Sequence, residues 1–118
     1  MMSDESYEVR RVIANLECRA ADLGLTPTEV GKILLLKPGG WPLPISEQWA
    51  PIERSREARI RDLREVLQSV QAVVGFHAMF WLRRPNGHSG ISPLEFLMSD
   101  SDALRALRDV LRLETGSG

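Results

Sequence analysis

Few side chains in this sequence are of the types that carry out chemistry. His77 and His88 are eleven residues apart, one in an apolar stretch and one in a Gly-rich stretch, which is not the spacing of an acid–base pair or a metal site. The single Cys18 excludes an intramolecular disulfide and a cysteine-based zinc site, and we expect this thiol to be partly buried. Lys37-Pro38-Gly39-Gly40 lacks the spacing of a phosphate-binding loop. The sequence therefore predicts no enzyme, no cofactor and no metal site.

Arginine is the other candidate for a chemical role. Five arginines fall within eleven residues, namely Arg54, Arg56, Arg59, Arg61 and Arg64. Acidic residues interleave with them, namely Glu53, Glu57, Asp62 and Glu65. The formal net charge is −1 and the pI is about 6.1, whereas a nucleic-acid surface needs concentrated positive charge. We interpret the cluster as a charged, solvent-facing helix surface, and a local basic face stays open.

The composition is that of a small globular protein. The chain has 118 residues, 43% of them hydrophobic and 26% charged, enough for one domain or for two small helical units with a common core. The acidic start at residues 1–5 lacks the apolar segment of a signal peptide. No apolar run approaches the roughly 20 residues that span a bilayer. We therefore expect a cytoplasmic protein without a membrane segment.

The N-terminal third predicts two helices. Apolar residues at steps of three and four predict a helix over residues 4–23, ended by Gly24. Thr26-Pro27-Thr28-Glu29 has the features of a capping box with proline at the first helical position, and we expect its helix to end at Lys37-Pro38-Gly39-Gly40. The proline-rich residues 38–51 predict an ordered loop, because Trp41, Leu43, Ile45 and Trp49 are too apolar for a free linker.

These two helices resemble the opening of a helix-turn-helix domain. The recognition helix that should follow is missing, because Leu35-Leu36-Lys37-Pro38-Gly39-Gly40 cannot form it. Lys32 and Lys37 are the candidate DNA-binding residues. A DNA-binding transcriptional (auto)regulator therefore stays open as an alternative function.

The C-terminal half predicts a long helix and three shorter ones. The long helix covers Glu53–Val74, with Ile60, Leu63, Leu67, Val70 and Val74 on one face and Val66 and Val73 widening it. A short helix follows Gly75, with Phe80 and Trp81 packing at its end. Ser92-Pro93-Leu94-Glu95 repeats the capping pattern, and Ser99–Asp102 precedes a last helix. Its predicted inward residues are Ala103, Leu104, Leu107, Val110 and Leu111. The predicted fold class is all-α, with about six helices.

Two motifs in this half are similar to a known family. They are Trp81-Leu82-Arg83-Arg84-Pro85-Asn86 and, after a glycine-containing loop, Gly90-Ile91-Ser92-Pro93-Leu94-Glu95-Phe96-Leu97. In this order and spacing they resemble the toxin-binding domain of Xre/MbcA/ParS antitoxins, over about residues 60–114. The loop at residues 86–90 is about one residue shorter than the family pattern and lacks its leucine.

The resemblance implies an antitoxin of a type II toxin–antitoxin system. Its partner would be a RES-type, NAD-consuming toxin whose active site the antitoxin occludes, as a homodimer or in a larger complex with the toxin. It implies a degenerate helix-turn-helix region at residues 1–52 and a toxin-binding domain at 53–118. The candidate toxin-binding residues are Trp81, Pro85, Asn86, Arg105, Arg108, Arg112, Leu113 and Glu114. A purely structural role for Trp81, Pro85 and Pro93, and a dimerisation module built on the long helix, are the alternatives.

Overall fold

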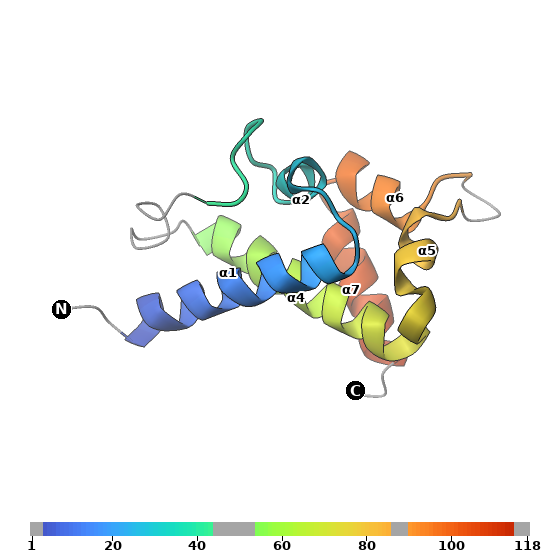
Figure 1. The fold of residues 1–118 in the computed structure, drawn as a ribbon, viewed down its shortest axis with the longest axis horizontal. Helices are drawn as coiled ribbons and strands as arrows, with labels where there is room; N and C mark the ends of the chain where they lie inside the picture. Colours follow the sequence, from blue (N-terminus) through green and yellow to red (C-terminus); the bar gives the residue numbers. More distant parts are fainter. Residues whose placement is uncertain (1–3, 44–53, 86–89, 115–118) are drawn as a thin grey trace.

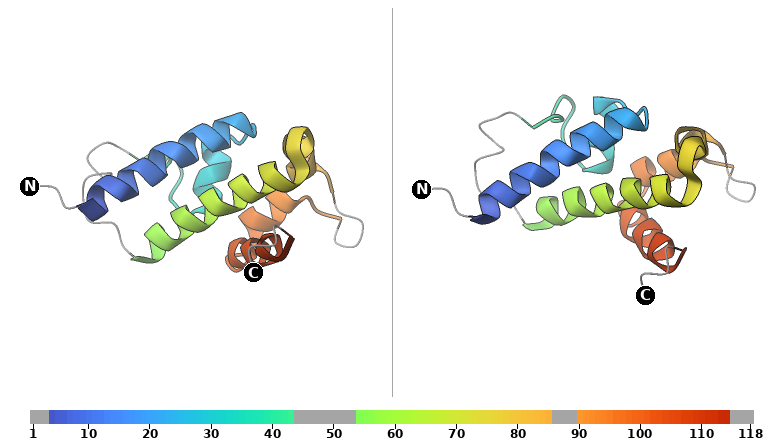
Figure 2. Two further views of the ribbon diagram at one scale, coloured as in Figure 1. Left: turned by 90° about the horizontal axis from the view of Figure 1, so that it is seen from below. Right: turned by 60° about the horizontal axis from the view of Figure 1, so that its bottom comes forward.

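A computed structural model describes residues 4–43, 54–85 and 90–114 of the chain, and their regular structure is entirely helical (Figure 1). The two longest helices, α1 (Asp4–Asp22) and α4 (Arg54–Val74), pack against each other. On its other side α4 packs against α7 (Ala103–Glu114), so that α4 runs between α1 and α7 (Figure 2). The predicted all-α fold class is confirmed.

Shorter elements close one end of this arrangement. They are α2 (Pro27–Ile33), the single 3-10 turn η1 (Gly75–His77), α5 (Ala78–Arg83) and α6 (Pro93–Ser99). Helix α6 contacts both α2 and α5, which ties the N-terminal third to the C-terminal half.

Helix α1 ends where glycine was expected to end it. Gly24 has φ +74°, and the N–H groups of Gly24 and Leu25 donate to the carbonyls of Ala21 and Ala20 at 3.1 and 2.9 Å. This is a Schellman cap, which needs a left-handed residue and favours glycine. The cap sends the chain directly into α2.

Helix α2 starts as predicted and ends earlier than predicted. Both bonds of the capping box are present: Glu29 N–H donates to Thr26 Oγ1 at 3.2 Å, and Thr26 N–H donates to Glu29 Oε1 at 2.9 Å. The expected end at Lys37 was wrong. A second Schellman cap closes the helix at Ile33, with Leu35 at φ +60° and Leu36 N–H donating to the Gly31 carbonyl at 2.9 Å. Because the left-handed residue is leucine, the sequence carried no glycine signal for this end.

The predicted faces of α4 and α7 are mostly buried. Ile60, Leu63, Val66, Leu67 and Val70 of α4 and Ala103, Leu104 and Leu111 of α7 belong to the core. Two predictions were wrong, since Val73 and Val110 are exposed. Val73 lies next to the end of α4. Val110 lies on the same exposed side of α7 as Ala106 and Leu113, whereas Leu104 and Leu111 lie on the buried side.

A single hydrophobic core joins the two halves of the sequence. Buried side chains from Val12 in α1 to Leu111 in α7 form one contiguous cluster, which includes Trp41 and Leu43 of the loop after α2, as expected for that apolar loop. The predicted boundary at residues 52/53 lies outside the described residues. Among the helices of the described ranges, none is both long and apolar enough to cross a membrane.

Candidate partner-binding surface

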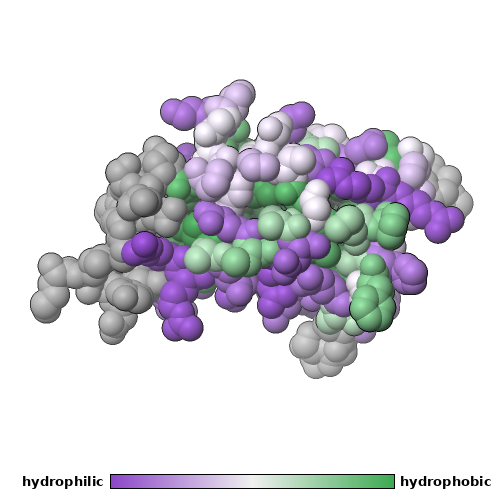
Figure 3. Space-filling model, in the orientation of Figure 1, coloured by the Kyte–Doolittle hydropathy of each residue, from purple (hydrophilic) through white to green (hydrophobic). Residues whose placement is uncertain are grey.

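The chain turns sharply after α4 and exposes large apolar side chains there. Gly75 has φ +68°, and η1 and α5 follow it directly. Phe76 is 99% exposed and Phe80 is 72% exposed, with Val73 and Met79 also exposed beside them. We call these four residues the apolar corner. Hydrophobic side chains gather at this end of the molecule in the space-filling view (Figure 3). Phe80 was predicted to pack at the helix end, and its exposure corrects that prediction.

Two further exposed apolar residues lie on α7, which packs against α4. Leu113 is 79% exposed, and Val110 precedes it by one turn. Of the large hydrophobic side chains exposed in the described ranges, all except Leu35 lie between Val73 and Leu113. Single exposed apolar residues are normal, whereas a cluster of them is typical of surfaces that bind another macromolecule. The four residues of the apolar corner, which lie within eight consecutive positions, form such a cluster.

The position of the apolar corner is fixed by a clamp from α5 to the start of α2. The Arg83 guanidinium donates to both carboxylate oxygens of Glu29, at 2.9 and 2.7 Å, and to the Gly24 carbonyl at 2.6 Å. Hydrogen bonding by Arg83 lowers the pKa of Glu29 below its ordinary value, against the smaller opposing effect of burial. This pair joins residues 54 positions apart, so no local pattern in the sequence indicates it.

The same contact favours glycine at position 24. A Cβ atom added to Gly24 would lie 3.2 Å from the Met79 Sδ atom, closer than side chains normally approach. Gly24 is therefore favoured by its left-handed backbone, and a larger residue would also require the Met79 side chain to shift by a few tenths of an ångström.

Two of the predicted toxin-binding arginines hold α7 against α4. Arg108 donates to Asp62 at 2.8 Å and also to the neighbouring Asp109, and Arg112 donates to both carboxylate oxygens of Glu65 at 2.6 and 2.8 Å. The Arg112 hydrogen bonds lower the pKa of Glu65, and the bonds to Asp62 and Asp109 raise the pKa of Arg108. These guanidinium groups already have carboxylate partners within the chain.

The remaining predicted residues divide between surface and core. Arg105, Leu113 and Glu114 are exposed on α7, and Arg105 forms no ion pair with any residue in the described ranges. Trp81 is partly buried and packs against the core, and Pro85 is exposed. Asn86 lies outside the described residues. The structure thus leaves Arg105, Leu113 and Glu114 exposed along α7 and packs Trp81 against the core.

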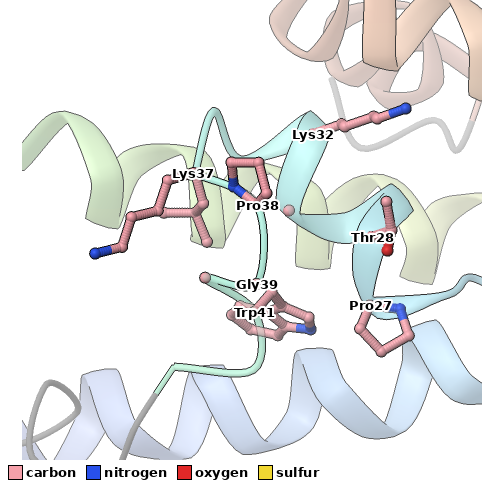
Figure 4. Close-up of a pocket in the computed structure, with 10 residues that line it drawn as sticks. Pro27, Thr28, Lys32, Lys37, Pro38, Gly39 and Trp41 are labelled. Atoms are coloured by element: carbon pink, nitrogen blue, oxygen red, sulfur yellow. The ribbon is translucent and has the colours of Figure 1, made fainter.

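Lys32 and Lys37, the candidate DNA-binding residues, lie at the edge of a small hollow of about 200 Å³ beside α2. Both lysines are exposed, the Trp41 ring is buried, and the two ammonium groups point away from each other (Figure 4). Residues 34–43, which follow α2, contain no helix. In this part of the chain no recognition helix accompanies the two lysines, so they offer contacts to a phosphate backbone and not to base edges.

The residues first considered for chemistry are not grouped. His77 is exposed, and His88 lies outside the described residues. Cys18 is exposed, so the expectation of a partly buried thiol was wrong. Within residues 4–43, 54–85 and 90–114, no three His, Cys, Asp or Glu side chains are arranged to hold a metal ion.

Comparisons with known proteins leave the family unassigned. No model of a protein family matches this chain, and no curated protein matches it as a relative. The functional interpretation therefore depends on the motifs at Trp81–Asn86 and Gly90–Leu97 and on the surface described above.

Proposed function

We propose that this protein is an antitoxin of the Xre/MbcA/ParS kind, which binds a RES-type, NAD-consuming toxin and neutralises it by occluding the active site. The observation that carries the proposal is the concentration of exposed apolar side chains between Val73 and Leu113. This region coincides with the segment whose motifs resemble the toxin-binding domain.

The apolar corner supplies the anchors for the toxin. Phe76 and Phe80 are large, exposed aromatic side chains, and residues of this kind supply most of the affinity of many interfaces. Arg105, Leu113 and Glu114 on the outer surface of α7 extend the contact toward the toxin cleft. Arg108 and Arg112 act indirectly, because they position α7 on α4.

A co-expression assay with the cognate RES-type toxin tests the proposal. The wild-type protein restores growth and cellular NAD, and the double variant Phe76→Ser/Phe80→Ser fails to do so, as does Leu113→Ser to a smaller extent. Leu35→Ser is the matched control, since Leu35 is also large, apolar and exposed but lies in the N-terminal third. We chose surface substitutions because truncation before α7 would remove the buried Leu104 and Leu111 and unfold the core.

Two results would contradict the proposal. The first is full neutralisation by the Phe76→Ser/Phe80→Ser variant in a soluble, folded form. The second is a protein that binds no toxin but shifts its own promoter DNA in a gel, with the shift abolished by Lys32→Glu/Lys37→Glu. The second result would favour the alternative function, a DNA-binding (auto)regulator, which the exposure of both lysines supports.

A further inference from the structure

A second hollow lies between α1 and α4, away from the apolar corner. It has a volume of about 290 Å³ and is lined by Glu8, Arg11, Val12, Asn15, Arg61 and Arg64. Every lining residue except Val12 is polar or charged, and three of them are arginines. The toxin-binding proposal makes no use of this site.

The helical repeat brings the three arginines together. Arg61 and Arg64 are three residues apart on α4 and therefore share a face. Helix α1 packs on α4 (Figure 2). Arg11 of α1 directly precedes Val12, which is buried in the core, and it lines the hollow together with Arg61 and Arg64. The alternation of acidic and basic residues along residues 53–65 does not reveal this cluster of three arginines, because Arg11 comes from another helix.

The positive charge in the hollow is poorly compensated within the described residues. Arg11 and Arg64 form no hydrogen bond or ion pair there, and Arg61 has one bond of 3.3 Å to Glu57. The Asn15 side-chain oxygen already accepts a bond from Arg19. Glu8 is the one carboxylate that lines the hollow, against three guanidinium groups.

One donor is both buried and unsatisfied. The Nε atom of Arg64 is removed from solvent and has no hydrogen-bond acceptor in the structure. A buried N–H group without a partner is destabilising, and in native proteins such groups often mark the place of a water or an ion. An anion bound in the hollow would reduce the mutual repulsion of the three guanidinium groups.

We propose that this hollow binds a phosphate group, either as inorganic phosphate or as the phosphate of a phosphomonoester. Planar guanidinium groups bind phosphate oxygens through paired, charge-assisted hydrogen bonds. A phosphate has enough oxygens to accept from all three arginines, whereas a carboxylate has only two. The hollow is at the small end of the roughly 300–1,000 Å³ range of ligand pockets, so it accommodates the phosphate and leaves an attached group outside.

Isothermal titration of the full chain with inorganic phosphate, at constant ionic strength, tests the proposal. The expected result is saturable binding of one phosphate, weakened about tenfold or more by Arg64→Gln or Arg11→Gln, since each removes charge-assisted bonds. Glu8→Gln is expected to tighten binding, because it removes the one negative charge of the lining. Arg56→Gln is the matched control on the same helix, exposed and outside the hollow, and binds as the wild type does.

Titration with adenosine monophosphate and with adenosine separates the two sources of the phosphate. If the site takes the phosphate group alone, the monophosphate binds as inorganic phosphate does and adenosine does not bind. Tighter binding of the monophosphate identifies a phosphomonoester as the ligand.

Absence of saturable binding, or equal affinity in wild type, Arg11→Gln and Arg56→Gln, overturns the proposal. Arg11 is exposed, so its variant remains a valid test even if Arg64→Gln does not fold. Toxin neutralisation is independent of all these outcomes.

Discussion

At the residue scale, Arg59 shows how one side chain can join three segments. It is one of the five arginines that we interpreted from the sequence as a solvent-facing surface. However, its guanidinium group donates two hydrogen bonds to the Ile33 carbonyl, at 3.2 and 2.6 Å, and one to the Ser101 carbonyl, at 2.8 Å. Ile33 is the last residue of α2, where carbonyl groups lack partners within the helix. Arg59 therefore caps α2 from α4 and also holds the start of α7.

Replacing Arg59 tests this role. Arg59→Met keeps the apolar stem but leaves two carbonyl groups without their charged donor, and we expect the free energy of unfolding to fall by about 3 kcal/mol. Urea denaturation followed by circular dichroism measures the change. Arg56→Met, three residues earlier and exposed, should alter stability by less than about 0.5 kcal/mol. Equal effects of the two substitutions would mean that the Arg59 bonds contribute nothing.

At the element scale, the helix starts could be predicted from the sequence and some of the ends could not. The caps at Thr26 and Ser92 are local, since each depends on residues within one turn, and the Ser92 side chain accepts from Glu95 N–H at 3.1 Å. The end of α2 at Leu35 was missed because leucine gives no left-handed signal. Exposure of Val73 and Val110 depends on where neighbouring helices stop covering α4 and α7, which periodicity does not encode.

The candidate surface was predictable only in part. Every residue of the segment Phe76–Leu82 except His77 is apolar, and a short surface helix can bury only one side, so exposure of some of these residues could have been expected. Sequence alone does not say which side faces the core. The pairing of Arg108 and Arg112 with α4 was equally hidden, because Asp62 and Glu65 lie more than forty positions away.

The contact between α2 and α5 should make stability depend on pH. Arg83 lowers the pKa of Glu29 in the folded state. The ionised carboxylate therefore makes its full contribution to the free energy of unfolding above pH 4.5, the ordinary pKa. This contribution is lost as the pH falls through the lower pKa of the folded state. Glu29→Gln keeps an acceptor for the Thr26 N–H but removes the charge. We expect this variant to lose less unfolding free energy than the wild type between about pH 7 and pH 3.

Chemical denaturation at the two pH values measures the difference. Arg83→Gln removes the same ion pair from the other side and should flatten the pH dependence in the same direction. A wild-type pH dependence in both variants would show that the pair does not contribute to acid sensitivity.

At the scale of the whole molecule, the core has no internal division among the described residues. The buried cluster runs from α1 through α4 to α7, and α4 supplies its centre. Leu67 of α4 is fully buried in this cluster. Disturbing the centre should therefore affect both outer helices together.

Leu67→Ala tests whether the chain unfolds as one unit. The cavity should lower the free energy of unfolding by about 2–5 kcal/mol. Native-state hydrogen exchange should then accelerate by the same factor for the slowest amides of α1 and α7. If the α1 amides kept wild-type protection while those of α7 lost theirs, the two halves would be separate cooperative units.

The shared core also restricts how a chain of this kind can change by recombination. A crossover between residues 43 and 54 would join the N-terminal segment of one protein to the C-terminal segment of another. Val12, Ile33 and Trp41 would then pack against side chains that differ from those in the present core. The Glu29–Arg83 pair would also be separated unless both residues were inherited together. Under the proposed function, partner specificity would then change by substitution at exposed positions such as Phe76 and Leu113, while the two segments are inherited together.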